Sequence, residues 1–177
     1  MSNFQKYEYN PQGGEGVDVY VIDTGIRVTH VEFQGRAVWG ATIPSNSVDE
    51  DTDGHGTHAA GTIASRKYGV AKAATVIAVK VLESKKGDMG DLIRGVVWAA
   101  KKAAAKAAAA EAEYAATGKT AHKGSVANMS VGSGKCRALE TAINKAADGG
   151  LHFAVAAGVS NLSRLYGIRL IHAIRQR

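Results

Sequence analysis

The fold is decided by the apolar run Val19-Tyr20-Val21-Ile22-Asp23-Thr24-Gly25, which ends on a carboxylate followed by a turn. Residues 17–22 are nearly all apolar and β-branched, as in a strand whose two faces are both covered by helices. An aspartate at the carboxyl end of a buried strand lies where open α/β sheets place their chemistry. The run therefore predicts a buried parallel strand and marks Asp23 as a candidate functional residue.

A histidine between two glycines follows Asp23 by 32 residues, in Asp53-Gly54-His55-Gly56-Thr57-His58-Ala59-Ala60-Gly61. The small residues suit a strand-to-helix corner, where His55 is exposed and a helix over 55–64 packs closely. Histidine is the side chain most easily used as a base near neutral pH. An aspartate that precedes a histidine matches two members of a Ser-His-Asp triad, in which the aspartate fixes the tautomer of the imidazole and stabilises its cation.

Both stretches resemble the subtilisin family (peptidase S8) of serine proteases, and within it the fungal proteinase K and vacuolar protease B (cerevisin) branch. Residues 16–26 and 53–58 carry the strongest resemblance. Further matching stretches are Gly69-Val70-Ala71-Lys72, Val79-Lys80-Val81-Leu82, Val126-Ala127-Asn128-Met129-Ser130-Val131-Gly132 and His152-Phe153-Ala154-Val155-Ala156-Ala157-Gly158. The resemblance implies a serine endopeptidase that works through an acyl-enzyme, with Asp23 and His55 as two of the three triad members.

The predicted fold class is α/β, the N-terminal portion of a subtilisin-like domain with three layers. Strands are expected at 17–22, 75–82, 125–130 and 151–157, with a weaker strand signal at 37–42. Helices are expected at 55–64, from about 91 onward, and at 137–148. Alternation of strands and helices predicts right-handed crossovers and a mostly parallel sheet with helices on both faces.

Two segments have unusual composition. Residues 1–16 are predicted to form an extended arm that leads through Gly13-Gly14-Glu15-Gly16 into the first strand. In the helix that starts near Asp91, the side chains expected to face the core are Leu92, Ile93, Val96, Val97 and Ala100. From residue 99 to 116 this helix becomes a tract of alanine and lysine. Because alanine has the highest helix propensity, the tract is predicted to project into solvent as a helix until Gly118 ends it.

The resemblance also implies a substrate cleft with two edges, Gly87-Asp88-Met89-Gly90 and Ser130-Val131-Gly132. A polypeptide substrate would lie between them as an added strand, bound through backbone hydrogen bonds. Glycines at these edges let the two chains approach closely. A simple loop and a plain strand end are the alternative interpretation of these residues. An inhibitory propeptide is a second partner that the family implies.

Two parts of the family's mechanism are not recognisable. The family's asparagine, which donates a hydrogen bond to the oxyanion, is replaced by Val159, which cannot donate one. No Gly-Thr-Ser-Met-Ala motif is present, and Ser160 has the wrong flanking residues to be the nucleophile. The nucleophile is expected beyond residue 177, so the polypeptide as written is predicted to be an inactive or nearly inactive fragment.

The chain divides at Gly158. Residues 1–158 are predicted to be the N-terminal part of the catalytic domain, and residues 159–177 form a tail that no longer resembles the family. Val159-Ser160 can be encoded by the start of a typical intron, so the tail is interpreted as translated intron. A gene fragment that does not fold stably, and a non-catalytic peptide-binding or interaction fragment, remain alternatives.

Composition and single residues exclude several other function classes. A net charge of +6 comes largely from lysines of the alanine-rich helix and arginines of the tail, without interleaved aromatics, so no nucleic acid is expected as partner. No apolar run reaches the length of a membrane span and no signal peptide is visible, so no membrane partner is expected and the compartment stays open, although the family is secreted or vacuolar. The chain is expected to be a monomer.

Metal chemistry is not indicated by the sequence. The acidic loop 49–54 begins like an EF-hand, but Ala60 stands where the bidentate glutamate would be required. His55 and His58 could form a zinc pair only with a third ligand, and none stands out, so His58 is predicted to be buried and hydrogen-bonded. The single cysteine, Cys136, is expected to be a packing residue. Calcium is possible by family, without a readable ligand set.

Overall fold

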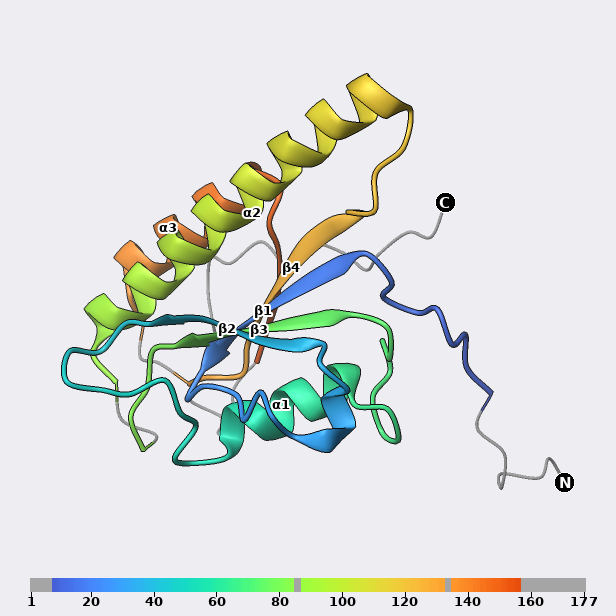
Figure 1. Cartoon of the computed structure of the whole chain (residues 1–177). Coiled ribbons are helices and arrows are strands. Elements are labelled where there is room, and N and C mark those ends of the chain that lie inside the picture. The colour runs from blue at the N-terminus through green and yellow to red at the C-terminus, as the bar shows by residue number, and fades with distance from the viewer. Residues whose placement is uncertain (1–7, 85–86, 133–134, 157–177) are drawn as a thin grey trace, which may run out of the picture.

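The computed structural model describes residues 8–84, 87–132 and 135–156, and its strands form one five-stranded parallel sheet in the order β2-β3-β1-β4-β5 (Figure 1). The strands are β1 (Val17–Asp23), β2 (Ala37–Thr42), β3 (Thr75–Lys80), β4 (Gly124–Met129) and β5 (His152–Val155). The helices are α1 (His55–Ala64), α2 (Met89–Thr117) and α3 (Arg137–Asp148), with a 3-10 turn η1 (Val31–Phe33). The predicted α/β fold class is confirmed.

Helices cover both faces of the sheet, as predicted, with α1 on one face and α2 and α3 on the other (Figure 1). Side chains of β1 alternate between the two layers because successive residues of a strand point to opposite faces. Val19 and Val21 pack in the core beneath α1, whereas Tyr20 and Ile22 pack in the core beneath α2 and α3. β1 is therefore the central buried strand that its apolar run predicts.

Five of the predicted elements differ from the structure by one or two residues at their ends: β1, β3, β4, β5 and α2. β3 stops at Lys80, two residues early, because the backbone N–H groups of Val81 and Leu82 both donate to the carbonyl of Asp23 and the regular ladder ends there. α2 begins two residues early, at Met89, because the Asp88 carboxylate caps it by accepting from the N–H of Gly90 at 2.6 Å.

The second half of α2 projects from the body of the molecule (Figure 1). Leu92 and Val96 are buried, but Val97, which was expected to face the core, is 41% exposed because it lies about 100° around the helix axis from Val96. Ala103 is the last buried residue of α2, and residues 104–117 are almost all exposed. Gly118 ends the helix with φ of 70° and donates to the carbonyl of Tyr114. The predicted solvent-facing extension is confirmed.

Residues 1–16 were expected to form an extended arm; residues 1–7 lie outside the described ranges, and residues 11–16 are not extended. Residues 11–16 form consecutive turns, in which Gly13 donates to the carbonyl of Asn10 and Val17 to that of Gly14. Gly14 has φ of 86°, and a Cβ there would lie 2.8 Å from the Cβ of Ala74. Glycine therefore allows a tight turn at this point, packed against Ala74 just before β3.

No helix in the described ranges is both long and apolar enough to cross a bilayer.

Candidate active site

Parallel strands bring the candidate site residues to one edge of the sheet. Asp23 is the last residue of β1 and pairs in register with Lys80, the last residue of β3. β4, on the other side of β1, pairs Val21 with Asn128, so continuing this register places Ser130 level with Asp23. α1 begins at the same edge with His55. The carboxyl end of the sheet therefore collects residues from four separate stretches of sequence, as expected of an open α/β sheet.

Asp23 and His55 are in direct contact. Nδ1 of His55 lies 2.8 Å from Oδ1 and 3.0 Å from Oδ2 of Asp23. Because an ionised carboxylate can only accept, the Nδ1–H donates, and in the neutral imidazole the opposite nitrogen, Nε2, then carries the lone pair. The Asp23 side chain is fully buried, whereas that of His55 is 41% exposed. This geometry holds one tautomer of an imidazole whose other nitrogen is available as a base.

The environment of Asp23 is both buried and hydrogen-bonded. Burial raises the pKa of Asp23 above its usual value, and hydrogen bonds from His55 and Thr24 offset part of that rise. The backbone N–H of Thr24 donates to Oδ1 at 2.7 Å. The carboxylate is thus held by two donors in a site without water exposure, which fixes its orientation toward the imidazole.

Gly56 lets α1 lie directly against the turn after β1. A Cβ at residue 56 would come within 2.1 Å of the carbonyl oxygen of Gly25 and 3.1 Å of the Cβ of Asp23. The N–H of Gly56 donates to Oγ1 of Thr24 at 2.9 Å. Glycine at this position is therefore a condition for the close approach of His55 to Asp23.

Asp51 was not singled out by sequence reasoning, although it has the densest set of hydrogen bonds at this edge. It accepts from Thr24, Gly54 and Thr57, and it also accepts from the N–H of Asp53 at 3.2 Å. Burial alone would raise the pKa of Asp51, but hydrogen bonds from Thr57, Gly54 and Thr24 outweigh it and hold the pKa below its usual value. In the sequence, the only sign of this role is that Asp51 lies six residues before Thr57, which is in the first turn of the helix predicted over 55–64.

Lys80 and Glu83 form a second cluster that the sequence did not reveal. Lys80 is fully buried, and its Nζ donates to the carbonyl of Glu50 at 2.7 Å and lies 3.1 Å from Oε2 of Glu83. Hydrogen bonds from Ser47 and Thr52 and the contact with Lys80 hold the pKa of Glu83 at about 2. These contacts tie the acidic loop to the end of β3.

The two predicted substrate edges both follow strand ends, with different local structure. Of the first, Gly87 lies in the loop, whereas Asp88 is the cap of α2 and Met89 and Gly90 are in its first turn. Ser130, Val131 and Gly132 continue from the end of β4. Oγ of Ser130 donates to Oδ1 of Asn128 at 3.2 Å, Val131 packs against the core, and a Cβ at Gly132 would meet open space.

His58 is exposed, so its predicted burial is wrong. The buried residues of α1 are Gly56, Ala60 and Ala64, and His58 lies on the opposite side of the helix. It lines a solvent-facing hollow of about 680 Å³ together with His30 and Tyr68. Among the described residues, no group of three His, Cys, Asp or Glu side chains is placed to hold a metal ion.

Other sequence-level candidates lie away from Asp23 or outside the described ranges. Cys136 is the cap of α3, and it is partly buried against the core, in the packing position expected for it. Val159 and Ser160, with the rest of the tail, fall outside the described residues.

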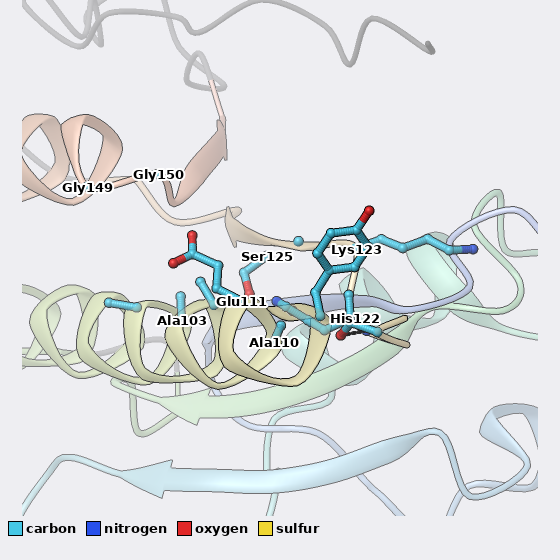
Figure 2. Close-up of a pocket in the computed structure, with 13 residues that line it drawn as sticks. Ala103, Ala110, Glu111, His122, Lys123, Ser125, Gly149 and Gly150 are labelled. Carbon is cyan, nitrogen blue, oxygen red and sulfur yellow. Dashed lines mark hydrogen bonds between the residues drawn. The ribbon is translucent and has the colours of Figure 1, made fainter. Parts of the chain in front are cut away.

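A second hollow lies at the opposite, amino end of the sheet, between the α2 extension and the start of β4 (Figure 2). It has a volume of about 430 Å³, and one wall consists of alanines of α2 such as Ala103 and Ala110. Ser125 and His122 line the other side. Asp23 and His55 are not among its lining residues, so this hollow is separate from the candidate active site.

Comparison with known proteins matches most of the chain to subtilisin-like serine proteases. A family model described as "Subtilase family" matches residues 14–167. The chain is 55% identical over 162 residues to the subtilisin-like serine protease Pen ch 18 of Penicillium rubens, covering 91% of the chain and 31% of that protein. It is 57% identical over 163 residues to alkaline protease 2 of Aspergillus fumigatus, covering 91% of the chain and 32% of that protein.

Solved structures match the same region. A cold-adapted subtilisin-like serine proteinase superposes with a TM-score of 0.74 at 39% identity, covering 91% of this chain and 53% of that one. Sphericase superposes with a TM-score of 0.65 at 30% identity, covering 88% of this chain and 49% of that one. The chain therefore spans about a third of the length of these curated relatives and about half of the length of these solved chains.

Proposed function

Because the chain belongs to the subtilase family, we propose that Asp23 and His55 are the carboxylate and the base of a serine endopeptidase triad. The observation that carries the proposal is the contact between Nδ1 of His55 and Oδ1 of Asp23 at 2.8 Å. A fully buried carboxylate beside a partly exposed imidazole is the arrangement that a general base requires. The pair comes from β1 and α1, two elements that the family match includes.

In this role, Nε2 of His55 removes the proton from a serine hydroxyl as its oxygen attacks the carbonyl carbon of the scissile bond. The resulting imidazolium is stabilised by the ionised Asp23, which does not itself take the proton. His55 then gives the proton to the leaving amine, and an acyl-enzyme forms. A water molecule, activated in the same way, hydrolyses the acyl-enzyme and restores the serine.

The triad also needs a nucleophilic serine. Within residues 8–84, 87–132 and 135–156, no serine hydroxyl hydrogen-bonds to His55. We propose that the nucleophile belongs to a segment like the family's Gly-Thr-Ser-Met-Ala stretch, and that these 177 residues alone hydrolyse peptide bonds little or not at all.

The proposed substrate is an extended polypeptide at the carboxyl edge of the sheet. Ser130 is level with Asp23 by register, and Gly132 has open space at its Cα, which suits a backbone approaching from solvent. On the other side, α2 begins at Met89, so Gly87 and Asp88 are the residues of 87–90 that lie before the helix. The propeptide expected by family would bind to the same two segments of a monomeric enzyme.

A second candidate function is peptide binding without hydrolysis. It is favoured by the missing serine partner of His55 in the described part of the chain, because binding at the strand edges does not need a nucleophile. The same two segments, 87–90 and 130–132, would then hold a peptide that is released intact.

Two proteins distinguish these functions. One is the 177-residue chain, and the other is a chimera in which residues 1–156 are followed by the corresponding remainder of alkaline protease 2 of Aspergillus fumigatus. Both are treated with a serine-directed fluorophosphonate probe, with a labelled extended peptide and with casein. We expect the chimera to be labelled and to hydrolyse casein, and the 177-residue chain to remain unlabelled.

Variants of the chimera test the two residues directly. His55→Ala is expected to lower kcat by about 10⁶-fold and Asp23→Asn by about 10⁴-fold, the magnitudes already known for triad members in subtilisin and trypsin. A folded wild-type chimera that is neither labelled nor active would overturn the protease function. Labelling of the 177-residue chain would show that it has its own nucleophile, and peptide binding without labelling would favour the second candidate.

A further inference from the structure

We propose that Asp51 is a positioning residue whose carboxylate fixes the first turn of α1, and with it His55, relative to Asp23. The catalytic consequence of this placement rests on the proposed function of Asp23 and His55. The placement itself follows from a set of hydrogen bonds that join the two elements from which the pair comes. The Asp51 carboxylate accepts hydrogen bonds from Gly54 and Thr57, on either side of His55, so it acts on His55 through the backbone.

The first half of this set holds α1. Oδ1 of Asp51 accepts from the N–H of Gly54 at 2.9 Å, and Oδ2 accepts from the N–H of Thr57 at 2.9 Å and from its hydroxyl. The first N–H groups of a helix have no partner within the helix, and a side chain at the cap normally accepts from one of them. Gly54 occupies the cap of α1 and has no side chain to do so. Asp51, three residues before Gly54, accepts from the N–H of Thr57 and so does what a cap side chain would do. Its negative charge also interacts favourably with the positive end of the helix dipole.

The second half of the set holds the end of β1. Oγ1 of Thr24 donates to Oδ1 of Asp51 at 2.8 Å and accepts from the N–H of Gly56 at 2.9 Å. The backbone N–H of Thr24 donates to Oδ1 of Asp23 at 2.7 Å. A continuous path of hydrogen bonds thus runs from the catalytic carboxylate through Thr24 to Asp51 and the first turn of α1.

The chemistry of the site requires an ionised acid at residue 51. A carboxylate is acceptor-only and can take several donors at once, whereas an asparagine presents an NH₂ group that would face one of them. The Asp51 carboxylate accepts five hydrogen bonds, from the hydroxyls of Thr24 and Thr57 and from three backbone N–H groups. The lowered pKa of Asp51 agrees with this surrounding. Asp51 is therefore charged at neutral pH and matched to its partners.

Position matters because proton transfer between His55 and its partners depends on sub-ångström geometry. A displacement of about 1 Å at a reacting group can cost roughly 10²-fold in rate. His55 is flanked by Gly54 and Gly56, whose backbones restrict it weakly, and both of these glycines donate into the set described above. Loss of Asp51 would release the turn that carries the imidazole while leaving Asp23 and His55 chemically intact.

The test is a nuclear magnetic resonance measurement on the full 177-residue chain with ¹⁵N-labelled histidine. The reported signal is the hydrogen-bonded Nδ1 proton of His55 and the two ring nitrogen shifts. Asp23→Asn, which removes the charged acceptor, defines the signal of a broken pair. We expect Asp51→Asn and Thr24→Val to move the His55 signals most of the way from wild type to Asp23→Asn.

Matched variants separate positioning from general stability. Asp49→Asn removes the same charge from the same loop, but Asp49 accepts from Thr42 at 2.6 Å and is not among the hydrogen-bond partners of α1. Thr24→Ser keeps the hydroxyl that Thr24→Val removes. Both Asp49→Asn and Thr24→Ser should retain the wild-type His55 signals. If Asp51→Asn lowers the melting temperature but leaves these signals unchanged, Asp51 is only a helix cap and the proposal is wrong. If Asp51→Asn does not fold, the comparison of Thr24→Val with Thr24→Ser tests the proposal, and equal His55 signals in these two variants would overturn it.

Activity is measured separately in the chimera. Asp51→Asn is expected to lower kcat by about 10- to 100-fold with little change in KM, because the substrate contacts are untouched. An inactive wild-type chimera would defeat the protease function without affecting the His55 signals. Unchanged kcat in Asp51→Asn, with an active wild type, would defeat the positioning role alone.

Discussion

The two ends of the parallel sheet are built in different ways. At the carboxyl end, Asp23, Asp51 and Glu83 each accept several hydrogen bonds, and the short helix α1 lies against the turn after β1 without room for a side chain at Gly56. At the amino end, the α2 extension overhangs the sheet (Figure 1), and its Lys106 contacts the buried Asp18. One end depends on many partners at fixed positions, and the other on the helix propensity of alanine.

This difference indicates where substitutions are tolerated. A carboxylate with several donors loses all of them together when it is replaced, and each buried donor left without a partner is costly. An exposed alanine in a helix contacts little beyond its own turn, so a tract of simple composition can stand there. Four predictions test how far the contrast between the two ends extends.

The largest effect is expected at Gly56, at the carboxyl end. Gly56→Ala places a methyl group 2.1 Å from the carbonyl oxygen of Gly25, so α1 must move away from β1, at a cost of about 3 kcal/mol in the free energy of unfolding. Gly61→Ala, in the same helix, meets open space and should stabilise by about 0.5–1 kcal/mol. Urea unfolding of both variants makes the comparison, and equal midpoints would show that the close approach of α1 is not required.

The Lys106–Asp18 ion pair should give the next largest effect and is the main exception to the simple character of the amino end. Lys106→Met leaves Asp18, whose side chain is 5% exposed, without its cation, at a cost of about 2 kcal/mol. Lys102→Met is the control on the same helix, since the Lys102 amine lies over the Trp98 ring at 5.6 Å and should contribute under about 1 kcal/mol. If the two variants unfold at the same denaturant concentration, the α2 extension does not anchor to β1.

A smaller effect, dependent on pH, is expected at Glu83. Its pKa is about 2 in the folded chain and is lowered from 4.5, so the folded state favours the charged form. The stabilisation is fully present above pH 4.5 and is lost as the pH falls from 4.5 toward 2. The difference in melting temperature between wild type and Glu83→Gln should therefore be constant above about pH 5.5 and shrink below it. A difference that grows on acidification would contradict the assigned partners.

The smallest effect is expected in the α2 extension. Ala108→Gly lowers the local stability of an exposed helix by about 1 kcal/mol, the intrinsic cost of glycine, without changing global unfolding. Ala99→Gly, at a fully buried position of the same helix, should lower global stability instead. Amide hydrogen exchange reports the first change and denaturant unfolding the second. Global destabilisation by Ala108→Gly would mean that the extension is part of the cooperative core.

The sequence was sufficient for the features that depend on local patterns. Apolar β-branched runs predicted the buried strands, and the helix over 55–64 was predicted at its observed bounds because glycine and alanine mark a helix packed against a sheet. Asp23 and His55 were chosen because the chain order of an aspartate and a histidine matches a triad. These inferences require only the residues next to each other in the sequence and a family resemblance.

The remaining features depend on contacts between distant residues. Asp51 meets Thr24 across 27 residues and Lys80 meets the carbonyl of Glu50 across 30, and no local pattern shows that those partners will coincide. His58 and Val97 were placed on the wrong side of their helices, since histidine and valine occur on both buried and exposed faces. The cap at Asp88 begins α2 at Met89, two residues before the start that was expected near residue 91.

The central position of β1 has a consequence for how the chain reaches this structure. β1 pairs with β3 through Asp18 and Thr75, 57 residues apart (75 − 18), and with β4 through Val17 and Gly124, 107 residues apart (124 − 17). Pairings between such distant segments close large loops before they gain stability, and folding rates fall as mean contact separation rises. During synthesis, β1 is made before β3 and β4, the two strands that flank it. Of these three strands, the one made first therefore completes its pairing last, and its apolar side chains stay uncovered on one side until β4 has been made.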